Sequence, residues 1–223
     1  MTADFAAQRE GMVERQLRRR GIADERVLAA MGAVPREFFV PDRQRRRAYA
    51  DSALPTGHGQ TISQPWIVAA ICEALSLTGD ELVLEVGTGS GYSAAVLAGL
   101  GRKVLTIERI PELAASARGR LDELGFGNVE VVVGDGSVGL PERAPFDGIA
   151  VHATAPSPPP HLLDQLAAGG RLVIPIATDR ADMLTVFRRN APDADPRTLE
   201  GFGRVALAPC RFVPLIGDEG FPA

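Results

Sequence analysis

Three acidic side chains and a glycine-rich turn have the types and spacing to bind a nucleoside-like ligand. Residues 87–91 read GTGSG after Glu85, Glu108 ends the next apolar run, and Asp135 ends the one after it. Glycines let the backbone turn tightly and approach a ligand, and a following helix N-terminus offers free N–H groups. A carboxylate at Glu108 can accept hydrogen bonds from both ribose hydroxyls, and Asp135 can accept one from an adenine amino group.

The glycine spacing separates two classes of nucleotide-binding turn. The dinucleotide fingerprint reads GxGxxG, whereas the third glycine, Gly91, comes one residue early here. With Glu85 ahead of it, the turn resembles the E/D-x-G-x-G-x-G loop of class I S-adenosylmethionine-dependent methyltransferases. An NAD-dependent oxidoreductase is the alternative, because Glu108 also suits NAD, but no proton-donor pair is evident. The expected S-adenosylmethionine-binding residues are Gln60, Glu85, Gly87, Thr88, Gly89, Gly91, Tyr92, Glu108, Arg109, Asp135 and Gly136.

The elements that must position these residues alternate regularly from residue 81 to residue 176. Continuous apolar strands indicate burial on both faces, so we expect an α/β fold with a Rossmann-like, doubly wound, mostly parallel sheet. The turn and the acids then lie at consecutive strand ends along one crevice. The expected strands are 81–87, 103–108, 129–136, 146–153, 171–176, 183–189 and 203–215, and the expected helices are 66–77, 92–101, 111–125 and 161–170.

Residues 1–65 precede this pattern and are expected to form helices and an active-site loop packed on the core. Helices are expected over 5–20 and 24–34, with Asp24 capping the second, followed by an irregular stretch over 41–65. The expected division is therefore an N-terminal addition over 1–65, a methyltransferase domain over 66–217 and a tail over 218–223.

Longer motifs indicate which methyl acceptor the chain would use. GQTISQP (59–65), FDGIAVHATAP (146–156) and RFVPL (211–215), in order with the glycine turn, resemble protein-L-isoaspartate O-methyltransferases over roughly residues 11–217. The resemblance implies methyl transfer from S-adenosylmethionine to the free carboxylate of isoaspartyl residues in damaged proteins, which starts repair through a succinimide. A related O-methyltransferase acting on another peptide aspartate is the alternative. The resemblance implies substrate contacts by Thr61, Ile62, Asp51, Phe212 and Val213, the last two in a strand that pairs with an extended peptide.

Ser63 has two possible roles. A carboxylate with a reference pKa of about 3.9 is already ionised at pH 7, so the acceptor needs alignment and no general base. The resemblance then makes Ser63 a catalytic hydrogen-bond donor that orients the acceptor oxygen. Alternatively, Ser63 could cap the helix that starts near Pro65.

Four other residues carry weaker expectations. Asp51 is expected to hold the loop through hydrogen bonds, and His58 to be a loop residue without a chemical role. Trp66 could belong to the core or wall the methionine end of the cofactor. His152 stands where related sequences often have a small or hydroxyl residue, so it could alter the pocket near the substrate.

Composition sets the remaining expectations. The net charge is −4, although residues 1–50 hold 11 arginines against 7 acids. The arginine runs 18–20 and 45–47 are short and interleaved with acids, so we expect a solvated face and no nucleic-acid partner. With no apolar run of about 18 residues and no secretory signal pattern, we expect a cytoplasmic monomer without membrane contact. Cys72 and Cys210 are expected to be reduced, and no metal site is expected.

Overall fold

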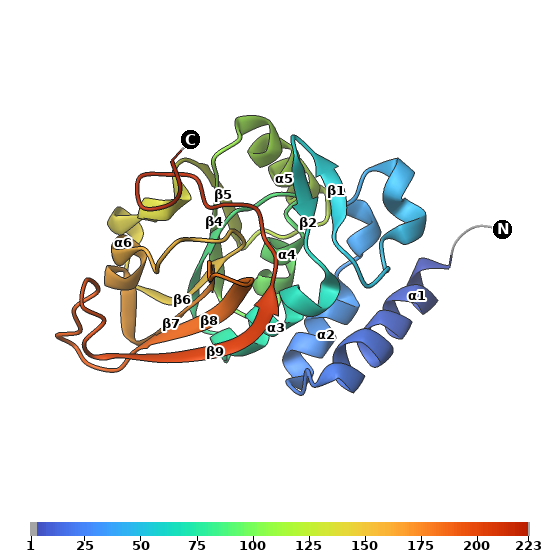
Figure 1. The fold of residues 1–223 in the computed structure, drawn as a ribbon. Helices are drawn as coiled ribbons and strands as arrows, with labels where there is room; N and C mark the ends of the chain where they lie inside the picture. The colour runs from blue at the N-terminus through green and yellow to red at the C-terminus, as the bar shows by residue number, and fades with distance from the viewer. Residues whose placement is uncertain (1–3, 223) are drawn as a thin grey trace.

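The fold, seen in a computed structural model that describes residues 4–222, is built on a seven-stranded sheet (Figure 1). Strands β3 to β7 run parallel, and β8 and β9 complete the sheet antiparallel. This arrangement confirms the expected doubly wound, mostly parallel sheet. In spatial order the strands are β5 (Val129–Val133), β4 (Lys103–Glu108), β3 (Leu82–Val86), β6 (Phe146–Val151), β7 (Leu166–Ile176), β8 (Asp182–Arg189) and β9 (Phe202–Cys210).

Both faces of the central strands are buried, as their continuous apolar sequence requires. In β3, Val83 contributes to one hydrophobic cluster and Leu84 to the other, and both are fully buried. The first cluster also contains side chains of the N-terminal helices, and the second contains those of the short helix before β7. The helices that flank the sheet are α3 (Pro65–Leu75), α4 (Tyr92–Ala98), α5 (Pro111–Glu123) and α6 (Pro160–Asp164).

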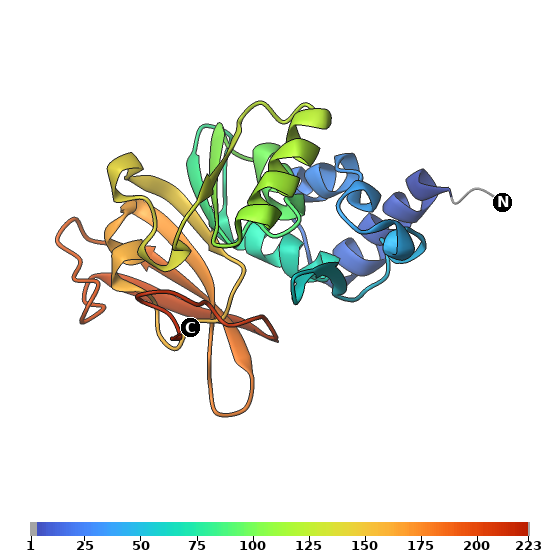
Figure 2. The same cartoon turned by 90° about the horizontal axis from the view of Figure 1, so that it is seen from above.

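The N-terminal segment packs at the opposite end of the molecule from β8 and β9 (Figures 1 and 2). Helix α1 (Phe5–Met12) continues through a π turn and a 3-10 turn to Arg20, and α2 (Glu25–Ala33) follows. The Asp24 side chain accepts from two backbone N–H groups of α2, which confirms it as the N-cap. Both expected helical segments are therefore present, and the second begins at the cap that the sequence predicted.

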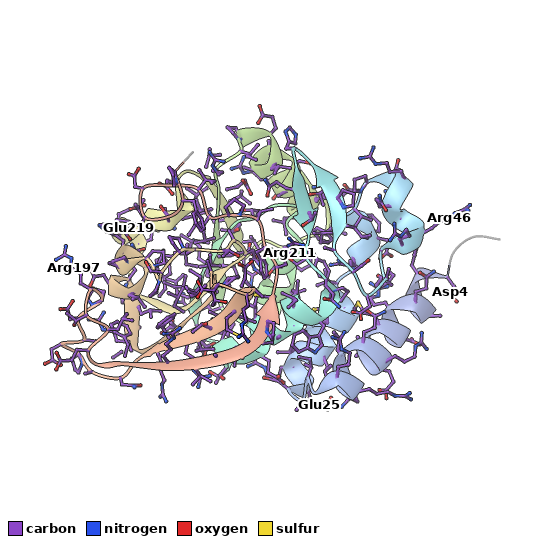
Figure 3. All side chains as sticks on the ribbon, viewed as in Figure 1. Asp4, Glu25, Arg46, Arg197, Arg211 and Glu219 are labelled. Atoms are coloured by element: carbon purple, nitrogen blue, oxygen red, sulfur yellow. The ribbon has the colours of Figure 1, made fainter. Side chains whose placement is uncertain are left out.

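The arginine runs of this segment lie on the surface. Arg18 pairs with Glu25, Arg20 with Asp51, and Arg46 points outward from the turn over 42–47 (Figure 3). Within residues 4–222, no helix is long and apolar enough to cross a membrane.

Three expectations about elements were wrong. Residues 41–65 include a hairpin, β1 (Leu54–Gly57) and β2 (Gln60–Ile62), whose turn has left-handed backbone at three successive residues from Gly57. Helix α6 ends at Asp164, because the chain from Leu166 onward already pairs with β6 as part of β7. The RFVPL motif follows β9 as irregular chain with a single bridge to Thr154, so its residues do not form a strand.

The turn that leads into β3 provides a pH-dependent prediction. The Glu81 carboxylate accepts from Thr78 N, Thr78 Oγ1 and Gly79 N, at 2.7–2.8 Å. Burial raises the pKa of Glu81, but these hydrogen bonds lower it more strongly, to about 2. The folded-state pKa is below the unfolded value, so this stabilisation is complete above pH ~4.5 and is lost as the pH falls toward 2. We expect Glu81→Gln to lower the free energy of unfolding at pH 7 and to lose that deficit between pH ~4.5 and 2.

Urea unfolding of both proteins at several pH values measures this difference. Glu142→Gln, at an exposed site in the turn before β6, is the control and should follow the wild type throughout. A Glu81→Gln deficit that stays constant from pH 7 to pH 2.5 would contradict the assignment.

Candidate functional site

A cavity of about 730 Å³ lies where β3 meets its neighbours β4 and β6. Strand order reverses at β3, and open α/β sheets bind ligands at the carboxyl ends of strands beside such a point. Strand β2 and the residues on either side of it line the cavity from the hairpin side, and Arg211, the residue after β9, also contributes to the lining (Arg211 is labelled in Figure 3). The lining comprises residues 53, 59–64, 67–68, 86–90, 92–93, 107–110, 136, 152–153 and 209–216.

The glycine turn adopts a backbone that other residues rarely accept. Gly87, Gly89 and Gly91 have φ values of 92°, 53° and 89°, in the left-handed region. A Cβ at Gly91 would lie 3.3 Å from Ala117 Cβ, so this glycine also permits close packing against α5. A Cβ at Gly89 would meet no atom of the described structure within 4 Å. The turn therefore offers bare backbone to the cavity ahead of helix α4.

Glu108 ends β4 beside the turn and is 6% exposed. Its Oε2 accepts from Gly89 N at 2.9 Å, and its Oε1 accepts from Ile110 N at 3.0 Å. These two bonds fix the carboxylate at the cavity edge, where each oxygen retains lone pairs for further donors. Arg109, the next residue, is exposed and also lines the cavity.

The loop over 61–63 lines the cavity from the hairpin side. Thr61 is exposed, Ile62 is buried against the core, and Ser63 is half-buried. Within residues 4–222, the Ser63 hydroxyl makes no hydrogen bond, while its carbonyl accepts from Arg36 Nη2 at 2.7 Å. Gln64 is the N-cap of α3 and gives no side-chain capping bond, so the capping alternative for Ser63 is wrong. Its hydroxyl therefore remains available to a ligand.

Comparison with known proteins assigns the family. The model of the family described as protein-L-isoaspartate(D-aspartate) O-methyltransferase (PCMT) matches residues 7–220. The chain belongs to this methyltransferase family. It is 56% identical over 218 residues to protein-L-isoaspartate O-methyltransferase 1 of Rhodopseudomonas palustris, covering 97% of this chain and 86% of the relative. It is 52% identical to protein-L-isoaspartate O-methyltransferase 2 of Marinobacter nauticus, covering 98% and 97%.

Solved structures of the methyltransferase family share this fold. A protein-L-isoaspartate O-methyltransferase superposes with a TM-score of 0.83 at 29% identity, over 95% of this chain and 67% of that one. A putative family member from Plasmodium falciparum superposes with a TM-score of 0.77 at 25% identity, over 93% of this chain and 98% of that one. The latter structure is a complex with S-adenosyl-L-homocysteine.

Two predicted carboxylates of this methyltransferase lie outside the cavity lining. Glu85 is fully buried beneath the glycine turn, and its Oε2 accepts from Thr106 Oγ1 at 2.5 Å. Asp135 accepts from Ser137 N and Asp218 N, both at 2.8 Å. Burial raises the pKa of Asp135, but these bonds and that of the Ser137 hydroxyl lower it below its ordinary value. Glu85 thus supports the turn from behind, and the neighbour of Asp135, Gly136, lines the cavity instead.

His152 is a site residue whose contacts the sequence did not reveal. It lines the cavity, and its Nε2 lies 2.8 Å from Ser93 Oγ and 3.2 Å from Glu85 Oε1. It therefore joins the end of β3 to the first turn of α4 beneath the cavity. The only sign of this role in the sequence was that His152 stands in the VHATAP motif, at a position where related sequences often have a small or hydroxyl residue.

Tyr92, Asp51 and Trp66 all make structural contacts, and of the three only Tyr92 lines the cavity. Tyr92 begins α4 and is 1% exposed, and its ring packs edge-on against Phe39. Asp51 Oδ1 accepts from Gln64 Nε2 at 2.6 Å, which agrees with the loop-holding role, but Asp51 does not line the cavity. Trp66 donates from Nε1 to the Arg20 carbonyl and likewise lies outside the lining.

Phe212 and Val213 line the cavity without belonging to a strand. Phe212 N donates to Asp182 Oδ2 at 3.1 Å, and the Val213 carbonyl accepts from Thr154 N at 2.8 Å. Phe212 and Val213 were expected to pair with a peptide through their backbone groups. The Phe212 N–H and the Val213 carbonyl are thus already bonded within the chain. His58 lies at the hairpin tip outside the lining.

Proposed function

We propose that this chain transfers a methyl group from S-adenosylmethionine to the free carboxylate of L-isoaspartyl residues in damaged proteins, which starts their repair through a succinimide. The observation that carries the proposal is the family match over residues 7–220, combined with a cavity that the glycine turn and the 61–63 loop share. The cofactor side and the acceptor side of one reaction therefore face each other across one space.

The residues present fit the cofactor. Left-handed glycines at the turn leave the backbone bare, and the Glu108 carboxylate ends the neighbouring strand, where a ribose is held in related folds. We propose that Gly87, Gly89, Glu108 and Gly136 hold S-adenosylmethionine, with Thr88, Gln60 and Arg109 beside them. When bound, this cofactor supplies an electrophilic methyl group on a positively charged sulfur.

The remaining residues would prepare the acceptor. A carboxylate at pH 7 is already anionic, so no residue has to remove a proton. We propose that the Ser63 hydroxyl donates a hydrogen bond to one acceptor oxygen and directs the other toward the methyl group. Buried Ile62 and the side chains of Phe212 and Val213 would exclude water, which strengthens that hydrogen bond.

Two matched peptides test the proposal. They are identical except that one carries aspartate and the other L-isoaspartate at a single position, and each is incubated with methyl-labelled S-adenosylmethionine. We expect base-labile label on the isoaspartyl peptide alone, because only its carboxylate matches the geometry for which the family is named. Equal labelling of both peptides would favour methylation of ordinary aspartate, and absence of label on both would contradict the proposal.

We also propose the physiological setting. Cys72 and Cys210 are free thiols, which is typical of a reducing compartment and supports the cytoplasm. Isoaspartyl-containing proteins and peptides would be the partners, and a monomer suffices because one chain supplies both walls of the cavity. Residues 66–217 would form the cofactor-binding domain, with residues 1–65 contributing the acceptor loop.

A further inference from the structure

Arg36 is a fully buried cation for which the described part of the chain provides no carboxylate partner. Its residue exposure is 0%, and within residues 4–222 no acidic side chain lies within ion-pair distance of its guanidinium. Nε donates to the Ala48 carbonyl at 2.7 Å, and Nη2 donates to the Ser63 carbonyl at 2.7 Å. The guanidinium carbon lies 4.7 Å from the centre of the Tyr92 ring. One side chain therefore joins four separate segments of the chain.

Burying the Arg36 guanidinium costs desolvation free energy, which an apolar side chain at this position would avoid. Removing a guanidinium from water without an opposite charge is strongly unfavourable, and Nη1 lacks a hydrogen-bond partner in the described structure. Burial accordingly lowers the pKa of Arg36, while the nearby Tyr92 raises it. What the side chain offers in return is geometry, because its planar fork presents donors in fixed directions while its charge lies over the Tyr92 ring.

Two of the four segments that Arg36 joins line the cavity on opposite sides. Ser63 belongs to the loop on the acceptor side, and Tyr92 begins α4 directly after the glycine turn. The bond to the Ser63 carbonyl fixes the backbone of that residue, while its hydroxyl has no hydrogen-bond partner among residues 4–222. The cation–π contact with the Tyr92 ring ties the same guanidinium to the cofactor side.

We propose that Arg36 is a positioning residue that sets the Ser63 hydroxyl relative to the glycine turn. The inference rests on the proposed function, since it gives Arg36 an effect only through Ser63. Lysine keeps the charge, but its single ammonium group cannot present donors in the fixed planar directions with which the guanidinium reaches the Ala48 and Ser63 carbonyls. A displacement of about 1 Å in a reacting group can lower a rate roughly 100-fold.

A double-mutant cycle on methyl transfer tests the proposal. We expect Arg36→Lys and Arg36→Gln each to lower kcat/KM for an isoaspartyl peptide by roughly 10- to 100-fold. The dissociation constant for S-adenosylhomocysteine, measured by calorimetry, should change much less. In the Ser63→Ala background the same Arg36 substitutions should cause almost no further loss, because the group that Arg36 positions is already absent.

Arg26 provides a matched control. It too bridges two carbonyls, donating to Leu77 O at 2.7 Å and Leu100 O at 3.0 Å, and none of these residues lines the cavity. We expect Arg26→Lys to lower the melting temperature while leaving kcat/KM unchanged. Comparing it with Arg36→Lys separates loss of stability from loss of positioning.

Three results would overturn the proposal. The first is Arg36 and Ser63 losses that multiply in the cycle, and the second is full activity in both Arg36 variants. The third is failure of both variants to fold, which would assign Arg36 to stability alone. A Ser63→Ala protein with unchanged turnover would instead contradict the role given to Ser63 in the proposed function, so the two failures are distinguishable.

Discussion

Ser63→Ala should fold like the wild type and lose most of its methyl transfer. Removing the hydroxyl removes the only proposed donor to the acceptor carboxylate, and we expect kcat/KM for an isoaspartyl peptide to fall roughly 10- to 100-fold. Because Gln64 and not Ser63 caps α3, the melting temperature should stay within about 2 °C of the wild type. Steady-state kinetics and thermal unfolding on the same preparation measure both quantities.

A second serine serves as control for this variant. Ser157 is exposed in the loop between β6 and α6, away from the cavity lining, and Ser157→Ala should behave as the wild type. A Ser63→Ala protein with unchanged turnover and a clearly lower melting temperature would show that the hydroxyl stabilises the fold and takes no part in the reaction.

Glu108→Ala should abolish most cofactor binding. The carboxylate holds Gly89 N and Ile110 N, and in the proposed complex it also accepts from the ribose hydroxyls. A hydrogen bond to a charged group contributes about 1.5–3 kcal/mol, and each 1.4 kcal/mol changes an affinity tenfold. We therefore expect the dissociation constant for S-adenosylhomocysteine to rise at least roughly 10- to 100-fold, as measured by isothermal titration calorimetry.

The matched control is an acid on the adjacent strand. Glu130 on β5 pairs with Lys103 and Arg143 outside the cavity, so Glu130→Ala should leave cofactor affinity unchanged. If both variants lost the same affinity, the cause would be the change in net charge or in stability and not the loss of a specific contact of Glu108 with the cofactor. Unchanged affinity in Glu108→Ala would remove Glu108 from the cofactor site.

Local sequence determined most of the parallel core. The strand predicted over 103–108 is β4, with the same bounds. Its continuous apolar sequence was enough to predict it, because its side chains are buried on both faces of the sheet. The hairpin over 54–62 was missed because its strands are only four and three residues long and the first contains proline. Leu166–Gly170 has helical composition, but pairing of Leu166 with Phe146 of β6 places it in a strand.

Features of the site that depend on neighbouring residues could be predicted from the sequence. Contacts between residues far apart in the chain could not. The three turn glycines have the left-handed backbone that their spacing implied. The contact of Asp135 with a ligand stays a prediction, whereas its bonds to Ser137 and to Asp218, 83 residues along the chain, could not be read from a short motif. Arg36 reaches Ser63 across 27 residues, a contact that no short motif reveals.

The most direct test of the account is a crystal structure with S-adenosylhomocysteine and an isoaspartyl peptide bound together. We expect the ribose hydroxyls on Glu108 over the glycine turn, and an isoaspartyl carboxylate oxygen accepting from Ser63 Oγ on the opposite side of the cavity. A nucleoside bound away from residues 87–91, or a Ser63 hydroxyl directed away from the peptide carboxylate, would contradict it.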